Sequence, residues 1–113
     1  MESILTSVKK LCGGIREENT SFDDEIIMYI NSIFLTLNQL KVGTDKVFRI
    51  EDNKACWTDF ISEDDPVFET CKIYVGSKVR LRFDPPTNSS VMQALTETIK
   101  ECEWRINEQT ELK

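Results

Sequence analysis

The amino-acid sequence predicts a mainly α-helical protein with one hydrophobic core. Its 113 residues are about the length of a single domain. A hydrophobic fraction of 40% and a charged fraction of 30% are ordinary for a folded globular chain. Two long segments, 23–40 and 90–106, space their apolar residues as amphipathic helices do. We therefore expect residues 1–113 to form one domain built mainly from helices.

The N-terminal segment predicts a short helix that begins at Ser3 and stops at Gly13-Gly14. Its apolar residues repeat with the spacing of one helical face. They are Ile4, Leu5, Val8, Leu11 and Cys12. A first helix of about two turns therefore precedes the longer elements.

The second helix follows from a broad apolar stripe of nearly four turns. The stripe consists of Ile26, Tyr29, Ile30, Ile33, Phe34, Leu37 and Leu40. Thr20 or Ser21 is the expected N-cap, and the acids at 23–25 favour the positive end of the helix dipole. Gly43 is the expected stop.

A long ordered connection is expected between this helix and the next long element, over residues 44–65. Val47, Phe48 and Ile50 suit a brief extended piece. Further on, the apolar residues have the spacing of one packed helical turn. These are Trp57, Phe60 and Ile61.

The segment 67–83 fits two structures. Apolar and polar residues alternate through 73–83, which is the period of a half-buried strand, and this local pattern favours a strand. Asp65-Pro66 nevertheless suits a helix start, and a helical apolar stripe can also be drawn. That stripe consists of Phe68, Cys71, Val75, Val79 and Phe83. In either case Pro85-Pro86 ends the element, because proline cannot continue a helix ladder.

The last helix is predicted from a heptad pattern after a capping box at Ser90 and Gln93. The heptad residues are Met92, Leu95, Ile99, Cys102 and Ile106. The polar tail 108–113 is expected to be loose in the isolated protein and to become ordered on a partner.

Composition and charge exclude several classes of function. The chain has no histidine, so it lacks the imidazole that histidine-dependent triads and histidine-ligated zinc or haem sites require. The net charge of −6 disfavours tight DNA binding and attraction to anionic membranes. Four widely separated cysteines are expected as buried thiols in a reducing cytoplasm. No leader or membrane span is expected.

Acid clusters are the only catalytic candidates, and their spacing does not match a metal-dependent hydrolase. They occur at 17–18, 23–25, 51–52 and 63–65, where solvated or capping acids are the ordinary occupants. No i, i+4 carboxylate pairs converge as magnesium sites need, and the four glycines are too scattered to cradle a phosphate. We expect no catalytic, cofactor-binding or metal-binding residues.

A protein interface is the site that the sequence supports. Lys78, Arg80 and Arg82 gather positive charge that suits an acidic neighbour, although a solvated face is the commoner role. Trp104 and Arg105 beside the heptad seam complete the candidate interface. For Trp104 alone, a place in the core is favoured over a subunit contact.

Several motifs resemble the head-tail connector proteins of long-tailed bacteriophages and prophages. They are YVGSKVRLRFDPP at 74–86, SSVMQAL at 89–95 and EWRIN at 103–107, with FDDEIIMYINSIF at 22–34, LKVG at 40–43 and WTDF at 57–60 upstream. The resemblance covers nearly the whole chain. It depends on the order and spacing of these motifs, and none of them is catalytic. Where many members carry a bulky apolar residue, this chain has Gly76-Ser77.

The resemblance implies an all-α fold, a small bundle of about four helices with 67–83 helical and a long irregular connection before it. It implies a non-enzymatic protein that forms a ring, usually of twelve copies, which joins the portal to the tail in the virion after assembly in the host cytoplasm. The implied partners are other copies of the chain, the portal protein and a tail-completion or stopper protein, with DNA passing through unbound. The alternatives are an acidic helical regulator of one protein partner and, less favoured, a metal-dependent hydrolase.

Overall fold

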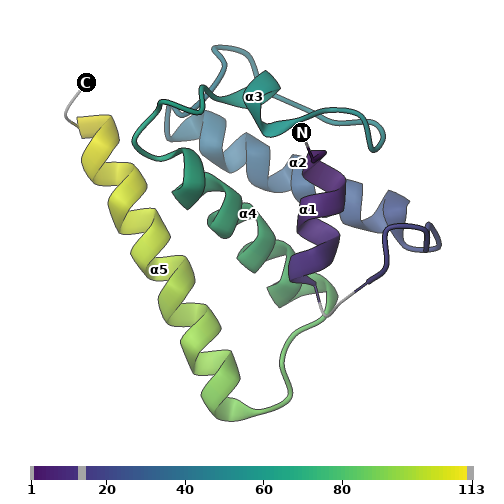
Figure 1. Ribbon diagram of the computed structural model, residues 1–113. Helices are drawn as coiled ribbons and strands as arrows, with labels where there is room; N and C mark the ends of the chain where they lie inside the picture. Colours follow the sequence, from purple (N-terminus) through teal and green to yellow (C-terminus); the bar gives the residue numbers. More distant parts are fainter. Residues whose placement is uncertain (1, 13–14, 112–113) are drawn as a thin grey trace.

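The computed structural model describes residues 2–12 and 15–111, which form five helices and no β-strand. The helices are α1 (Ile4–Leu11), α2 (Asp23–Gln39), α3 (Trp57–Phe60), α4 (Phe68–Phe83) and α5 (Ser89–Glu111). Figure 1 shows α4 between α5 and α1, with α2 crossing them. The predicted all-α fold class is confirmed. No helix in the described ranges has the length and apolar character needed to cross a membrane.

Helix α4 replaces the strand that the local alternation of 73–83 favours. Its buried residues are Phe68, Cys71, Tyr74, Val75, Gly76 and Val79. Because consecutive helical residues are about 100° apart, this set spans more than half of the helix circumference. Helices α1, α2 and α5 all pack on α4. Burial from several sides removes the single apolar stripe that identifies a surface helix. The alternating pattern is also misleading at Ile73, which a half-buried strand would bury but which is 45% exposed.

Helix α1 is tied to the connection that follows α2. The hydroxyl of Ser3 caps α1 by accepting a hydrogen bond from the Thr6 amide at 3.1 Å. The Ile4 amide donates to the Ala55 carbonyl at 2.8 Å. The buried indole of Trp57 donates to the Ser7 hydroxyl at 2.8 Å. The predicted start of this helix is confirmed, and the predicted stop at 13–14 lies outside the described residues.

The start of α2 is stabilised by a buried lysine and not by the predicted Thr20 or Ser21 cap. Phe22 occupies the cap position and offers no side-chain hydrogen bond. Lys9 of α1 is only 2% exposed, and its ammonium contacts the Asp23 carboxylate at 2.8 Å. The same ammonium donates to the backbone carbonyls of Glu17 at 3.0 Å and Asn19 at 2.7 Å. All three ammonium protons are therefore used, which is the condition for burying a charge without a large penalty.

The end of α2 also differs from the prediction of a Gly43 stop. The left-handed residue that follows the helix is Lys41, at φ +64°, and the Val42 amide donates back to the Leu37 carbonyl at 3.0 Å. Gly43 serves a second turn at φ +84°, where a Cβ atom would overlap the ring of Phe60. The glycine is thus required by the ring beside it.

The long connection before α4 is ordered by α2 and by an aromatic cluster. Residues 47–50 form no strand, but the Asn31 side chain donates to the Ile50 carbonyl at 3.0 Å and accepts from the Ile50 amide at 2.8 Å. The ring centroid of Phe34 lies 5.1 Å from that of Phe48 and 4.6 Å from that of Phe60. The predicted helical turn at 57–61 is confirmed as α3 followed by buried Ile61.

The ends of α4 and α5 correct the predicted caps. Asp65 accepts from the Val67 amide at 3.0 Å, but α4 begins at Phe68, so Asp65-Pro66 forms a turn ahead of the helix. At α5, Asn88 and not Ser90 supplies the cap, accepting from the Ser90 amide at 2.8 Å and the Val91 amide at 3.2 Å.

The predicted heptad face of α5 packs inward through its C-terminal half, and the helix runs further than expected. Ile99, Cys102 and Ile106 are buried. The helix continues to Glu111, through most of the segment that we expected to be a loose tail. Here the Thr110 hydroxyl lies 3.2 Å from the carbonyl of Leu40, the residue that follows α2. Ordering of this tail on a partner stays a prediction, and residues 112–113 lie outside the described ranges.

Two glycine substitutions are expected to differ in cost. Gly43→Ala should lower the free energy of unfolding by about 2–4 kcal/mol, because the residue is left-handed and the Phe60 ring that it meets is buried. Gly76→Ala should change it by less than about 1 kcal/mol. Its Cβ would overlap the half-exposed Cδ1 tip of Leu11, which can turn away, and would lie 3.3 Å from the Leu11 Cβ and Cγ. Helix α1 therefore needs to shift only slightly, and the helix propensity of alanine offsets that cost. Urea denaturation measures both, and equal losses would contradict this explanation.

Lys9→Met is expected to destabilise the protein by about 3–5 kcal/mol, because the Asp23 carboxylate and two carbonyls would lose a buried cation. Methionine nearly preserves the side-chain volume, so the loss reports the charge and its hydrogen bonds. Lys10→Met is the matched control, since Lys10 is exposed and its ion pair is with exposed Glu2. Chemical denaturation of both variants checks the difference. A control loss as large as that of Lys9→Met would refute the role given to the buried ammonium.

Candidate functional site

The basic residues predicted as an interface do not form one patch. Lys78 and Arg82 are four residues apart on α4 and so share a face of the helix. Arg82 is exposed, while half-buried Lys78 places its ammonium 5.5 Å from the ring centroid of Tyr74. Neither forms an ion pair with a carboxylate in the described part of the chain. This basic pair, Lys78 and Arg82, therefore keeps its charge available.

Arg80 points to another side of α4, about 160° away from Lys78 by helical geometry. It lines a hollow of about 320 Å³ together with residues that precede and begin α5, among them Asp84, Asn88 and Val91. Its Nε atom is buried and makes no hydrogen bond to any described residue. Arg80 is thus partly enclosed within its own protomer.

Trp104 lies on the outer face of α5 with 63% of its surface exposed. The place in the core that we favoured for it is therefore wrong. The side chain misses the core because Ile99, Cys102 and Ile106 fill the inward face and Trp104 lies on the opposite side. Arg105 is next to it, held 2.9 Å from the Glu101 carboxylate. Both residues border a shallow hollow of about 250 Å³ beside Pro66 and Val67. The structure therefore divides four of the five predicted interface residues into two separate pairs, Trp104 with Arg105 on α5 and Lys78 with Arg82 on α4.

An acidic stripe surrounds this tryptophan. Residues spaced by four, three, four and three fall on one face of a helix, and all of those on this face are exposed. They are Glu97, Glu101, Trp104, Glu108 and Glu111, and we call them the Trp104 stripe. No other aromatic residue lies on the described part of α5. The stripe thus combines one large apolar side chain with four carboxylates.

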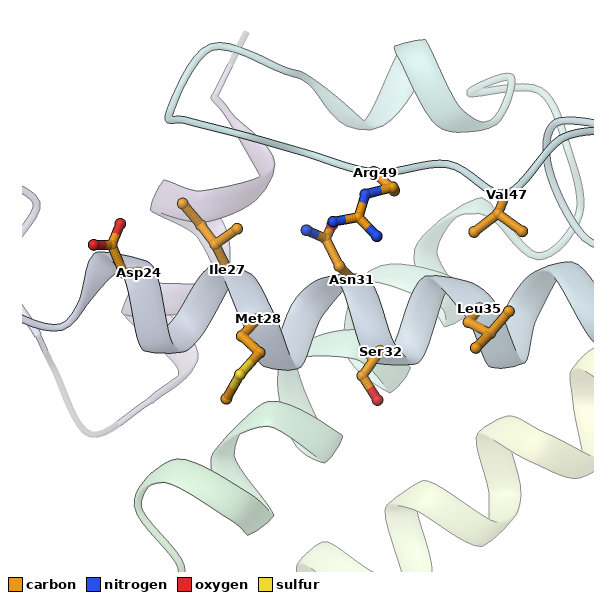
Figure 2. Close-up of a pocket in the computed structure, with 8 residues that line it drawn as sticks. All are labelled: Asp24, Ile27, Met28, Asn31, Ser32, Leu35, Val47 and Arg49. Atoms are coloured by element: carbon orange, nitrogen blue, oxygen red, sulfur yellow. The ribbon is translucent and has the colours of Figure 1, made fainter.

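A groove that the sequence analysis missed runs along the outer face of α2 (Figure 2). It has a volume of about 640 Å³. The lining residues are Asp24, Ile27, Met28, Asn31, Ser32, Leu35, Val47 and Arg49, which we call the α2 groove. Met28 is 60%, Leu35 47% and Val47 41% exposed. The available signal was the spacing of Met28 and Leu35 by seven residues, opposite the buried stripe.

The acid clusters do not converge on a common point. Within residues 2–12 and 15–111, no group of three or more cysteine and carboxylate side chains is placed to hold a metal ion. Asp23 is used by Lys9, and Asp59 accepts from the Cys56 amide at 2.8 Å. These acids thus have structural partners of the kind that helix starts require.

The four cysteines are thiols, as predicted, and Cys12, Cys71 and Cys102 are buried. Cys56, which we also expected to be buried, is only partly buried. Burial raises the pKa of Cys12 to about 11, with a smaller upward contribution from Asp84. Burial also raises the pKa of Cys102. The pKa of Tyr74 is raised mainly by burial and, to a smaller extent, by the hydrogen bond of its hydroxyl to Glu103. Cys12 and Cys102 therefore stay protonated at neutral pH and do not have the lowered pKa of a nucleophilic thiolate.

Comparison with known proteins identifies one family. The family model described as "Phage connector protein" matches residues 4–113, which is nearly the whole chain. No curated protein and no solved structure gives a match.

Alkaline pH is expected to destabilise the fold through the buried thiol. The raised pKa of Cys12 means that its stabilising contribution is complete below pH 9.0, the ordinary thiol value, and is lost as the pH rises toward about 11. Cys12→Ala should flatten this decline. The control Val8→Ala, at a buried apolar position of the same helix, should lower stability without changing its pH dependence. Urea titrations from pH 7 to 11 under reducing conditions measure both, and an unchanged slope for Cys12→Ala would contradict the assignment.

Proposed function

Because the chain belongs to the phage connector protein family, we propose that it forms a ring that joins the portal vertex of a phage head to the tail. The family is one of structural proteins, and the chain is a structural connector in that sense. The finer proposal is a ring of twelve copies at the head-tail junction of the virion, in contact with the portal protein and a tail-completion or stopper protein. The family match over residues 4–113 is the observation that carries it.

The exposed apolar side chains support an assembled state. Trp104 and the apolar part of the α2 groove lie on the outer faces of two different helices. A protein with two separate surfaces of this kind suits repeated contact with copies of itself or with neighbouring rings.

The charge distribution supports DNA passage without retention. A ring through which DNA slides should form few cationic contacts with phosphates, because each contact adds affinity that translocation must break. The net charge of −6 satisfies this requirement for the chain as a whole. We propose that the basic pair of Lys78 and Arg82 meets carboxylates of the portal or of an adjoining copy.

The competing candidate, a regulator of one protein partner, predicts a different stoichiometry. A regulator would form a complex of one or two copies, whereas a connector adds many copies to one portal. Native mass spectrometry of the chain mixed with the portal protein of the same phage genome separates the two.

Reversal of the basic pair, Lys78→Glu with Arg82→Glu, is expected to abolish ring formation or portal attachment, because it places acids opposite acids. The control is Arg16→Glu with Lys54→Glu, which changes the net charge equally at exposed positions outside α4. Co-sedimentation with the portal and negative-stain imaging are the measurements. A wild-type chain that never binds the portal would refute the connector function, and normal attachment of the double reversal would refute only the role of the basic pair.

A further inference from the structure

We propose that the Trp104 stripe of one copy docks in the α2 groove of the adjoining copy. The proposal rests on the ring assembly proposed above and names the two surfaces that meet. The occupant of the groove is therefore a second copy of this chain, presenting the outer face of α5.

The α2 groove has the shape and chemistry of a socket for one large apolar side chain. The groove is open to solvent, and its volume of about 640 Å³ leaves room for an indole with flanking side chains. Met28, Leu35 and Val47 supply apolar walls that are exposed in the protomer. Figure 2 shows Leu35 and Val47 together at one end, with Arg49 above Asn31 beside them.

The Trp104 stripe has the features of the matching surface, which we call the plug, with the α2 groove as its socket. Trp104 has the largest exposed fraction of any large hydrophobic residue in the described ranges, at 63%. Tryptophan is the residue type most enriched among those that dominate binding energy at interfaces. It projects from the middle of a regular helix of 23 residues, so the ring is presented from a rigid element.

Charge complementarity selects this pairing over other apolar occupants. Glu108 lies one turn beyond Trp104 and forms no ion pair with a described residue, so it brings negative charge wherever the indole docks. Glu101, on the other side, is paired with Arg105 at 2.9 Å. The wall of the groove carries exposed Arg49, and Lys46 is exposed beside Val47. An indole among these side chains would place its face near the Arg49 guanidinium, an attractive cation–π arrangement. The single acid of the lining, Asp24, lies at the opposite end of the groove from Leu35 (Figure 2).

The position of the two surfaces determines the kind of assembly. α5 packs on α4, and α2 packs on α4 and α1, so their outer faces belong to different sides of the bundle. Plug and socket are different patches, and a contact between them is head-to-tail. Contacts of this type add copies in one direction and close into a ring when the rotation per copy allows it.

Complementation between two defective variants tests the proposal. Trp104→Ala removes the plug and keeps the socket, while Leu35→Glu spoils the socket and keeps the plug. Both positions face solvent in the protomer, so both variants should keep the wild-type circular dichroism spectrum. Sedimentation velocity, alone and with the portal protein, measures the association of each variant and of their mixture.

We expect each variant alone to associate at least about 30-fold more weakly than wild type, the loss typical of a dominant interface residue. The equimolar mixture should form one-to-one dimers that do not grow, because each dimer contains one intact plug seated in one intact socket. Photo-cross-linking from benzoylphenylalanine at position 104 of the full chain should label residues 28–49 of a second copy.

Two results would overturn the inference. Self-association of both variants at wild-type strength would show that copies meet elsewhere, and the connector function would stand. Cross-links from position 104 to the portal or to another segment, or no cross-link between copies, would equally reject this pairing. Failure of the wild-type chain both to self-associate and to bind the portal is a separate result that would reject the connector function as well.

Discussion

The arrangement of the helices depends on the burial of α4 from more than one side. Tyr74 lies toward α5, where its hydroxyl donates to Glu103 at 3.0 Å, and Gly76 lies toward α1, where its missing side chain leaves room for Leu11. A glycine weakens an isolated helix by about 1 kcal/mol, so the close approach of α1 compensates for the lost propensity. The other helices are positioned by contacts with α4 more than by contacts with one another.

Polar side chains complete what apolar packing cannot specify. The buried ammonium of Lys9 joins α1, the loop before α2 and the first turn of α2. Asn31 performs a similar task on α2 by pairing with both backbone groups of Ile50. Each device satisfies backbone groups that would otherwise be unpaired when the loop packs against the helices.

The sequence predicted those elements whose burial is one-sided. The stripes of α1, α2 and α5 appear as helical periods because one face of each meets the core. The period of α4 was obscured by burial from several directions, so the residues allowed both a strand and a helix, and the family resemblance decided for the helix. Caps were predicted from residue type, but long-range partners such as Lys9 replaced them, and no local pattern encodes a contact with a residue 14 positions away.

The candidate surfaces were predictable only in part, for a related reason. Composition located the positive charge on α4 and identified Trp104 as an unusual residue. It could not tell core from surface for Trp104, because that depends on which residues already fill the inward face of α5. The α2 groove needs residues 47–49 to lie beside residues 24–35 of α2, which precede them by 12 or more positions, an arrangement created by the tertiary fold.

The double hydrogen bond between Asn31 and Ile50 has a consequence for recognition. It fixes the stretch of chain that bears Val47 and Arg49 to α2 before anything arrives. A partner that binds there meets a preorganised wall and does not have to order a flexible loop, so little conformational entropy is lost on binding. A single half-buried amide side chain on α2 in this way helps to set how tightly the groove that it lines can bind.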